Sequence, residues 1–121
     1  MDGLCFSRSR RLLTPRDYKQ VFDGASLKVS CKEVLILARP NQLGHARLGL
    51  VIAKRQVRQA NQRNRIKRIA RETFRHQLQL GGVDAVMLAR GGLDRLENAD
   101  LHRQLNQLWR QLQRKAAKTP E

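Results

Sequence analysis

A basic stretch in the middle of the chain, from residue 54 to residue 71, contains many lysines and arginines and no acidic residue. Its cations are Lys54, Arg55, Arg58, Arg63, Arg65, Lys67, Arg68 and Arg71. Guanidinium groups are planar and suit bidentate contact with phosphate. An ordinary solvated helix face mixes both signs of charge, since opposite charges three or four residues apart stabilise the helix. The stretch therefore predicts a phosphate-binding surface.

Two aromatic residues, Tyr18 and Phe22, lie four positions apart, which places both rings on one side of a helix. Exposed rings could stack on unpaired bases, as is common in proteins that bind irregular or single-stranded RNA. The alternative for Phe22 is burial in the core, which we expect when this residue is considered alone, whereas Tyr18 fits either role. No helix-turn-helix pair precedes the basic stretch at the usual short spacing, so RNA is favoured over DNA.

No catalytic or metal-binding group can be recognised among the remaining polar residues. The histidines at positions 45, 76 and 102 lack metal-ligand spacing, and no serine or cysteine has an evident base. The two glycine pairs lack the surrounding motif of a phosphate-binding loop. Cys5 and Cys31 form a single, widely spaced pair, so we expect free thiols in a reducing compartment. We therefore expect neither a catalytic residue nor a metal site in this protein alone.

The elements that must position the basic and aromatic residues follow from periodicity and from helix-capping residues. We expect a helix over residues 15–24 with Thr14 as its cap, strands within 27–39, over 47–53 and over 85–89, and helices over 61–78 and from Asn98 onward. A turn separates the strands within 27–39 and over 47–53, which predicts an antiparallel hairpin. The fold class is α+β, with order α-β-β-β-α-β-α and helices on a four-stranded mixed sheet.

Two helices are predicted to bury one side only. Projecting residues 61–78 at ~100° per residue separates two arcs. The apolar arc consists of Ile66, Ile69, Ala70, Thr73 and Phe74, and the opposite arc of Asn64, Arg65, Lys67, Arg68, Arg71 and Arg75. The last helix has one apolar stripe, formed by Leu101, Leu105, Leu108, Trp109 and Leu112.

The size and charge of the chain limit what it can be. Its 121 residues fit one domain, which we divide into a flexible basic arm (1–13), an RNA-binding domain (14–113) and a flexible basic tail (114–121). The formal net charge of +15 favours a polyanionic partner. No apolar run approaches the ~20 residues that span a bilayer, and the first residues lack the pattern of a secretory signal. We expect a cytoplasmic protein without a membrane partner.

Two neighbouring strings carry a resemblance to a known family. They are GLVIAKR at 49–55 and ANQRNRIKRIARE at 60–72, preceded by RLLTP at 11–15. With these strings, about residues 8 to 112 resemble the bacterial ribonuclease P protein subunit. This family implies an accessory protein on a large catalytic RNA, which together remove the 5′ leader of precursor tRNA by hydrolysis. The resemblance further implies that Mg²⁺ is held mainly by the RNA, that no obligate protein partner is needed, and that the strand-helix-strand crossover is left-handed.

The resemblance also assigns candidate site residues. For contact with the catalytic RNA these are Arg63, Asn64, Arg65, Lys67, Arg68 and Arg71. For a leader-binding cleft between the first helix and the sheet they are Tyr18, Phe22, Lys54, Arg55, Arg58 and Arg90. One departure from the family concerns the second strand, where Glu33 and Val34 stand in the place at which many members have an aromatic residue.

Two other classes of function fit a small basic α+β domain. One is a ribosomal or chaperone-like RNA-binding protein without an enzymatic partner, and the other is a free-standing nuclease or a DNA-packaging protein. Reconstitution with a ribonuclease P RNA separates the three, because only the accessory protein restores leader cleavage by the RNA and does nothing alone.

Overall fold

The computed structural model describes residues 11–12, 14–77 and 81–118. Its elements in chain order are α1 (Pro15–Gly24), β1 (Leu27–Ser30), β2 (Val34–Pro40), β3 (Arg47–Val51), α2 (Ala60–Arg75), β4 (Val83–Ala89), η2 (Leu93–Arg95) and α3 (Asn98–Lys118). This order confirms the predicted α+β class and the predicted sequence of elements. The described residues contain no helix that is both long and apolar enough to cross a bilayer.

The sheet has the strand order β1-β2-β4-β3. β2 pairs antiparallel with both β1 and β4, whereas β3 pairs parallel with β4. The predicted hairpin between β2 and β3 is therefore wrong, because β4 lies between them. β4 is buried along its first five residues, and a strand that is apolar on both faces belongs in the centre of a sheet.

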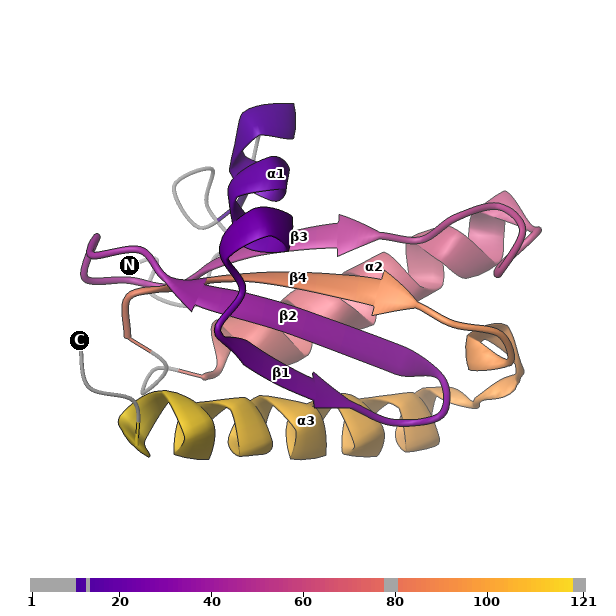
Figure 1. Ribbon diagram of the computed structural model, residues 1–121. Coiled ribbons are helices and arrows are strands. Elements are labelled where there is room, and N and C mark those ends of the chain that lie inside the picture. The colour runs from indigo at the N-terminus through magenta and orange to yellow at the C-terminus, as the bar shows by residue number, and fades with distance from the viewer. Residues whose placement is uncertain (1–10, 13, 78–80, 119–121) are drawn as a thin grey trace, which may run out of the picture.

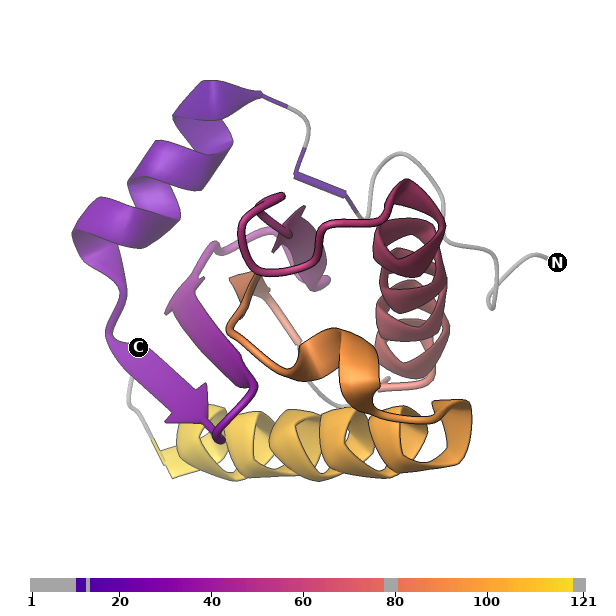
Figure 2. The same cartoon turned by 90° about the vertical axis from the view of Figure 1, so that its right-hand side faces the viewer.

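The helices form layers on both faces of the sheet. α2 and α3 cover one face, and α1 lies across part of the other (Figures 1 and 2). In Figure 1, α2 lies behind the sheet, and the parallel strands β3 and β4 both point to the right, with β3 above β4. Seen from the side of α2 with both strands pointing up, β4 therefore lies to the left of β3. A right-handed crossover would place β4 to the right, so the β3-α2-β4 crossover is left-handed. This confirms the handedness implied by the resemblance, which is an exception to the general right-handed rule.

The larger core lies between the sheet and the pair α2 and α3, and it contains the apolar stripes predicted for both helices. Phe74 and Trp109 meet edge to face with ring centroids 5.1 Å apart. The indole nitrogen of Trp109 donates a hydrogen bond of 2.9 Å to the Thr73 hydroxyl, which in turn donates to the carbonyl oxygen of Ile69. Thr73 thereby satisfies the one polar atom of the largest buried side chain.

α1 begins with the predicted cap. The Thr14 hydroxyl accepts a hydrogen bond from the Asp17 backbone nitrogen, and the Asp17 carboxylate accepts one from the Thr14 nitrogen, which is a capping box. Beneath the helix, Leu12, Val21 and Val86 form a second, smaller core cluster.

The boundaries of the chain's ends differ from those expected. Arg11 forms a bridge with Leu48, and the Leu12 nitrogen donates to the Leu48 carbonyl, so these two residues of the expected arm lie along β3. α2 ends at Arg75, and α3 continues through residues 114–118 of the expected tail. The rest of the arm and tail, residues 1–10, 13 and 119–121, and positions 78–80 lie outside the described residues.

A buried ion pair joins β3 to β4. Arg47 and Asp84 are register partners, and the guanidinium donates two hydrogen bonds, of 2.8 and 2.7 Å, to the two carboxylate oxygens. The Asn41 amide donates a third bond to the same carboxylate at 2.7 Å. The hydrogen bond to Asp84 raises the pKa of the Arg47 guanidinium. This network satisfies a carboxylate that is only 3% exposed.

We predict that Asp84→Ala lowers the free energy of unfolding by about 3 kcal/mol, because it leaves the Arg47 cation without its buried partner. Urea denaturation measures this loss. Asp23→Ala is the matched control: it removes the exposed pair between Asp23 and Lys19, whose side chains are 64% and 76% exposed, and should change stability little. Equal effects of the two variants would contradict the prediction.

Candidate nucleic-acid interface

The solvent-facing side of α2 presents the predicted polar residues. Asn64 and Arg68 are exposed, and Lys67 and Arg71 are partly exposed. The Arg68 side chain forms no hydrogen bond or ion pair with any other described residue. Because Ile66 and Phe74 are fully buried on the opposite side, the rotation of the helix about its axis is fixed. This side of α2 can therefore bind phosphates without rearrangement of the core.

Two of the predicted contacts, Arg63 and Arg65, are bound to the chain itself. One terminal nitrogen of Arg63 donates to the carbonyl oxygens of Val57 at 3.0 Å and Arg58 at 2.8 Å. Arg65 donates from all three of its nitrogens, to side chains and to a carbonyl oxygen. These two guanidinium groups hold neighbouring segments in place, in contrast to Arg68.

The loop between β3 and α2 adds further cations next to the helix (Figure 1). Lys54, Arg55 and Arg58 are exposed, whereas Val57 is fully buried and anchors the loop. Backbone bonds from Gln56 and Val57 to the Ala53 carbonyl shape the turn. Together with the Arg63 bonds, they give the loop a defined position at the start of α2.

Arg90 lies at the same edge of the sheet as this loop. β3 and β4 are parallel, so the segments that follow them leave the sheet at one edge. The backbone nitrogen of Arg90 donates to the Glu33 carbonyl, and its guanidinium to the Cys31 carbonyl at 3.2 Å. A side chain added at Gly91 would lie 3.5 Å from Gln56 of the loop. The structure therefore brings Arg90 close to the segment that carries Lys54, Arg55 and Arg58.

Arg71 lies where α2 approaches the N-terminal segment. Burial lowers the pKa of its guanidinium, and the positive charge of Arg11 lowers it further, with Tyr18 acting in the opposite direction. Arg11 is exposed, and Leu12 beside it is buried. A cation that was assigned to the arm thus stands beside the basic side of α2.

Of the two aromatic residues on α1, Phe22 is the more exposed. Its side chain is 43% exposed, so the expected burial of Phe22 in the core is wrong. Val21 is fully buried and takes the position that faces the sheet, which leaves Phe22 at the side of the helix. α1 covers only part of this face, where Leu35, Leu37 and Leu88 are also partly exposed. Phe22 is therefore exposed on the helix that partly covers this face.

Tyr18 is anchored on β3 instead. Its hydroxyl accepts a hydrogen bond of 3.2 Å from the backbone nitrogen of Leu50. Its ring lies so close to Gly49 that an added Cβ would be 2.6 Å from the Cε2 atom. Periodicity did not reveal this contact, but a glycine inside a strand is itself a signal of close approach by another group.

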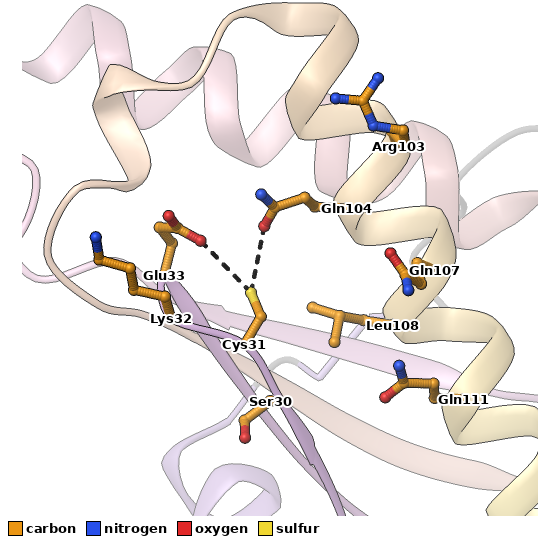
Figure 3. A pocket seen from close by; sticks show the side chains of 9 residues that line it. All are labelled: Ser30, Cys31, Lys32, Glu33, Arg103, Gln104, Gln107, Leu108 and Gln111. Carbon is orange, nitrogen blue, oxygen red and sulfur yellow. Dashed lines mark hydrogen bonds between the residues drawn. The ribbon is translucent and has the colours of Figure 1, made fainter.

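A polar pocket of about 480 Å³ lies between the β1–β2 turn and α3 (Figure 3). At its base the Cys31 thiol, which has one hydrogen to donate, lies 3.3 Å from the Gln104 side-chain oxygen and 3.7 Å from the Glu33 carboxylate. Cys31 is a free thiol, as expected, whereas Cys5 lies outside the described residues. The Glu33 carboxylate is thus directed to this pocket. Among the described residues, no three metal-binding side chains come together.

Comparison with known proteins agrees with this geometry. Residues 6–113 match the sequence pattern of the family described as Ribonuclease P. The chain belongs to the ribonuclease P protein family. It is 56% identical over 115 residues to the ribonuclease P protein component of Stutzerimonas stutzeri, covering 94% of this chain and 88% of the relative. The corresponding protein of Pseudomonas aeruginosa is 53% identical over 115 residues, with 94% and 85% covered.

Solved structures of the family share the fold. The RNase P protein of Thermotoga maritima has a TM-score of 0.70 and 29% identity, with 83% of this chain and 96% of that chain covered. The RNase P protein of Staphylococcus aureus has a TM-score of 0.76 at 23% identity, with 90% and 95% covered. The two structures support the α+β architecture described above.

We predict that Gly49→Ala destabilises the protein by about 1 to 3 kcal/mol, because the new methyl group collides with the Tyr18 ring and approaches Leu12. Thermal and urea unfolding measure the loss. In a Tyr18→Ala background the same substitution should cost clearly less, since the main collision is gone. Additive losses in the double variant would show that the ring does not limit this position.

Proposed function

We propose that this protein binds the RNA of ribonuclease P and the 5′ leader of precursor tRNA, and assists removal of the leader. The observation that carries the proposal is the set of cations on the exposed side of α2 and on the adjoining loop, with no acidic residue between positions 54 and 71, in a chain of this family. In this proposal the protein works in the cytoplasm with RNA as its partner and needs no second protein.

The contact with the catalytic RNA is assigned to the exposed side of α2. Asn64, Lys67, Arg68 and Arg71 reach the phosphates, and Arg63 and Arg65 support them. Each neutralised phosphate releases counterions, so affinity falls as salt rises. A net charge of +15 allows two polyanions, the catalytic RNA and its substrate, to approach each other on the protein.

The leader is assigned to the open part of the sheet beside α1. Phe22 offers a ring for stacking, and the cations of residues 54–58 and Arg90 offer phosphate contacts at the edge of the sheet. Tyr18 forms the inner wall of this path through its contact with β3. The Glu33 carboxylate is directed into the pocket against α3, so it does not line this path.

The reaction is hydrolysis of one phosphodiester bond. Water adds to phosphorus, the bond to the leader's 3′ oxygen breaks, and the 5′-phosphate stays on the tRNA. We assign the Mg²⁺ ions that activate water and stabilise the leaving oxygen to the RNA. The protein's side chains contribute binding and positioning, which lower the Mg²⁺ concentration that the RNA requires.

Reconstitution tests the proposal. At a Mg²⁺ concentration too low for the RNA alone, adding the protein to a ribonuclease P RNA should restore leader cleavage, and the protein alone should cleave nothing. Cleavage by the protein alone would identify a free-standing nuclease. Failure to stimulate the RNA while binding other structured RNA would favour a ribosomal or chaperone-like role.

We predict that Arg68→Gln weakens binding to the catalytic RNA and makes the dependence of log Kd on log salt shallower by about 0.7 to 0.9, the value of one phosphate contact. Titrations at several salt concentrations measure both. Arg110→Gln, at an exposed arginine on α3, removes the same charge elsewhere and serves as the control. Equal changes in both variants would contradict a specific contact on α2.

We predict that Phe22→Ala weakens binding of precursor tRNA to the holoenzyme by about 5-fold or more and spares mature tRNA, because base stacking contributes ~1 to 3 kcal/mol. Leu43→Ala is the control, since Leu43 is similarly exposed, at 50%, but lies in the turn before β3. Tyr18→Ala should also weaken precursor binding, by removing the inner wall of the path. Equal losses for precursor and mature tRNA would exclude the leader path.

A further inference from the structure

Arg65 connects three elements through a single guanidinium group. Its Nε donates to the Gln62 side chain at 2.8 Å within α2. One terminal nitrogen donates to the Asn98 side-chain oxygen at 2.7 Å, at the first residue of α3. The other donates to the Asp94 carbonyl oxygen in η2 at 3.3 Å. Each of the three nitrogens thus donates one hydrogen bond, and together these bonds fix the plane of the guanidinium group.

These bonds limit what Arg65 can offer to RNA. A bidentate phosphate contact uses two parallel N–H groups on one edge of the guanidinium. The three bonds involve all three nitrogens, so the group is held in place by the chain and cannot turn toward a phosphate without giving up bonds within the protein. The side chain of Arg68, three residues later on the same helix, has no such bond to any other described residue.

The first part of α2 has few apolar contacts of its own, so it depends on polar contacts to other elements. The buried apolar stripe begins only at Ile66, and residues 60–65 are all exposed or partly exposed. The helix cap, Gln59, makes no side-chain hydrogen bond. Polar contacts from Arg63 to the preceding loop and from Arg65 to η2 and α3 therefore hold this part of the helix, on which Asn64 lies.

We propose that Arg65 is a positioning residue of the RNA interface. It ties the start of α2 to the start of α3, so that Asn64, Lys67 and Arg68 meet the RNA already ordered. This inference rests on the proposed function, since it concerns the same side of α2. Its effect on affinity comes from the conformational entropy that binding would otherwise lose in ordering this part of the helix.

Asn98→Ala tests the inference without changing any charge. Loss of the acceptor should weaken binding to the catalytic RNA about 3- to 10-fold, which is within the range of one ordinary intramolecular hydrogen bond, with the salt dependence unchanged. Asn98→Ser keeps a residue that favours helix starts but is too short to reach the guanidinium, so its affinity should be as low. Arg65→Lys, which keeps the charge but not the planar group, should lose as much as Arg65→Gln.

The double variant completes the test. In an Arg65→Gln background, Asn98→Ala should cause no further loss of affinity, because the two residues act as a unit. Unchanged affinity in Asn98→Ala, or a shallower salt dependence in Arg65→Gln than in Arg65→Lys, would overturn the inference and make Arg65 a phosphate contact. If Arg68→Gln also leaves affinity and salt dependence unchanged, the proposed RNA interface on α2 fails as a whole.

Discussion

The burial of one side of α2 is the constraint on which the remaining features depend. Ile66, Ile69 and Phe74 fix the rotation of the helix against the sheet and α3, and Trp109 closes this contact through its bond to Thr73. Because the apolar side is fixed, the cations must lie on the other side. A single helix thus stabilises the fold and presents the cations of the proposed RNA interface.

The acidic residues all lie outside the basic stretch of residues 54–71. In the described structure Asp17 caps α1, Asp84 pairs with Arg47 between two strands, and Asp100 pairs with Arg103 on α3. Each of these acids has a local structural role, and none lies between residues 54 and 71. The cations of residues 54–71 repel one another. Solvent, and RNA in the proposed complex, offset this repulsion more than the acidic residues of the chain do.

Local signals in the sequence predicted the elements and their buried faces but not the contacts between distant segments. The Thr14 cap and the stripes on α2 and α3 follow from spacing, which is a property of neighbouring residues. The insertion of β4 between β2 and β3 depends on which strands are apolar on both faces. The bond between Arg65 and Asn98 joins positions 33 apart, and periodicity contains no information about such a pair. The exposure of Phe22 similarly depends on how little of the sheet α1 covers.

The central position of β4 has a consequence for biosynthesis. β2 and β3 are complete when residue 51 has been made, yet the strand that joins them, residues 83–89, follows only after all of α2. Until the ribosome has released that segment, both strands retain an unpaired edge and α2 has no closed sheet to cover. The nascent chain therefore exposes its most basic helix before the sheet is complete, and the pairings made by β4 depend on contacts that are distant in the sequence.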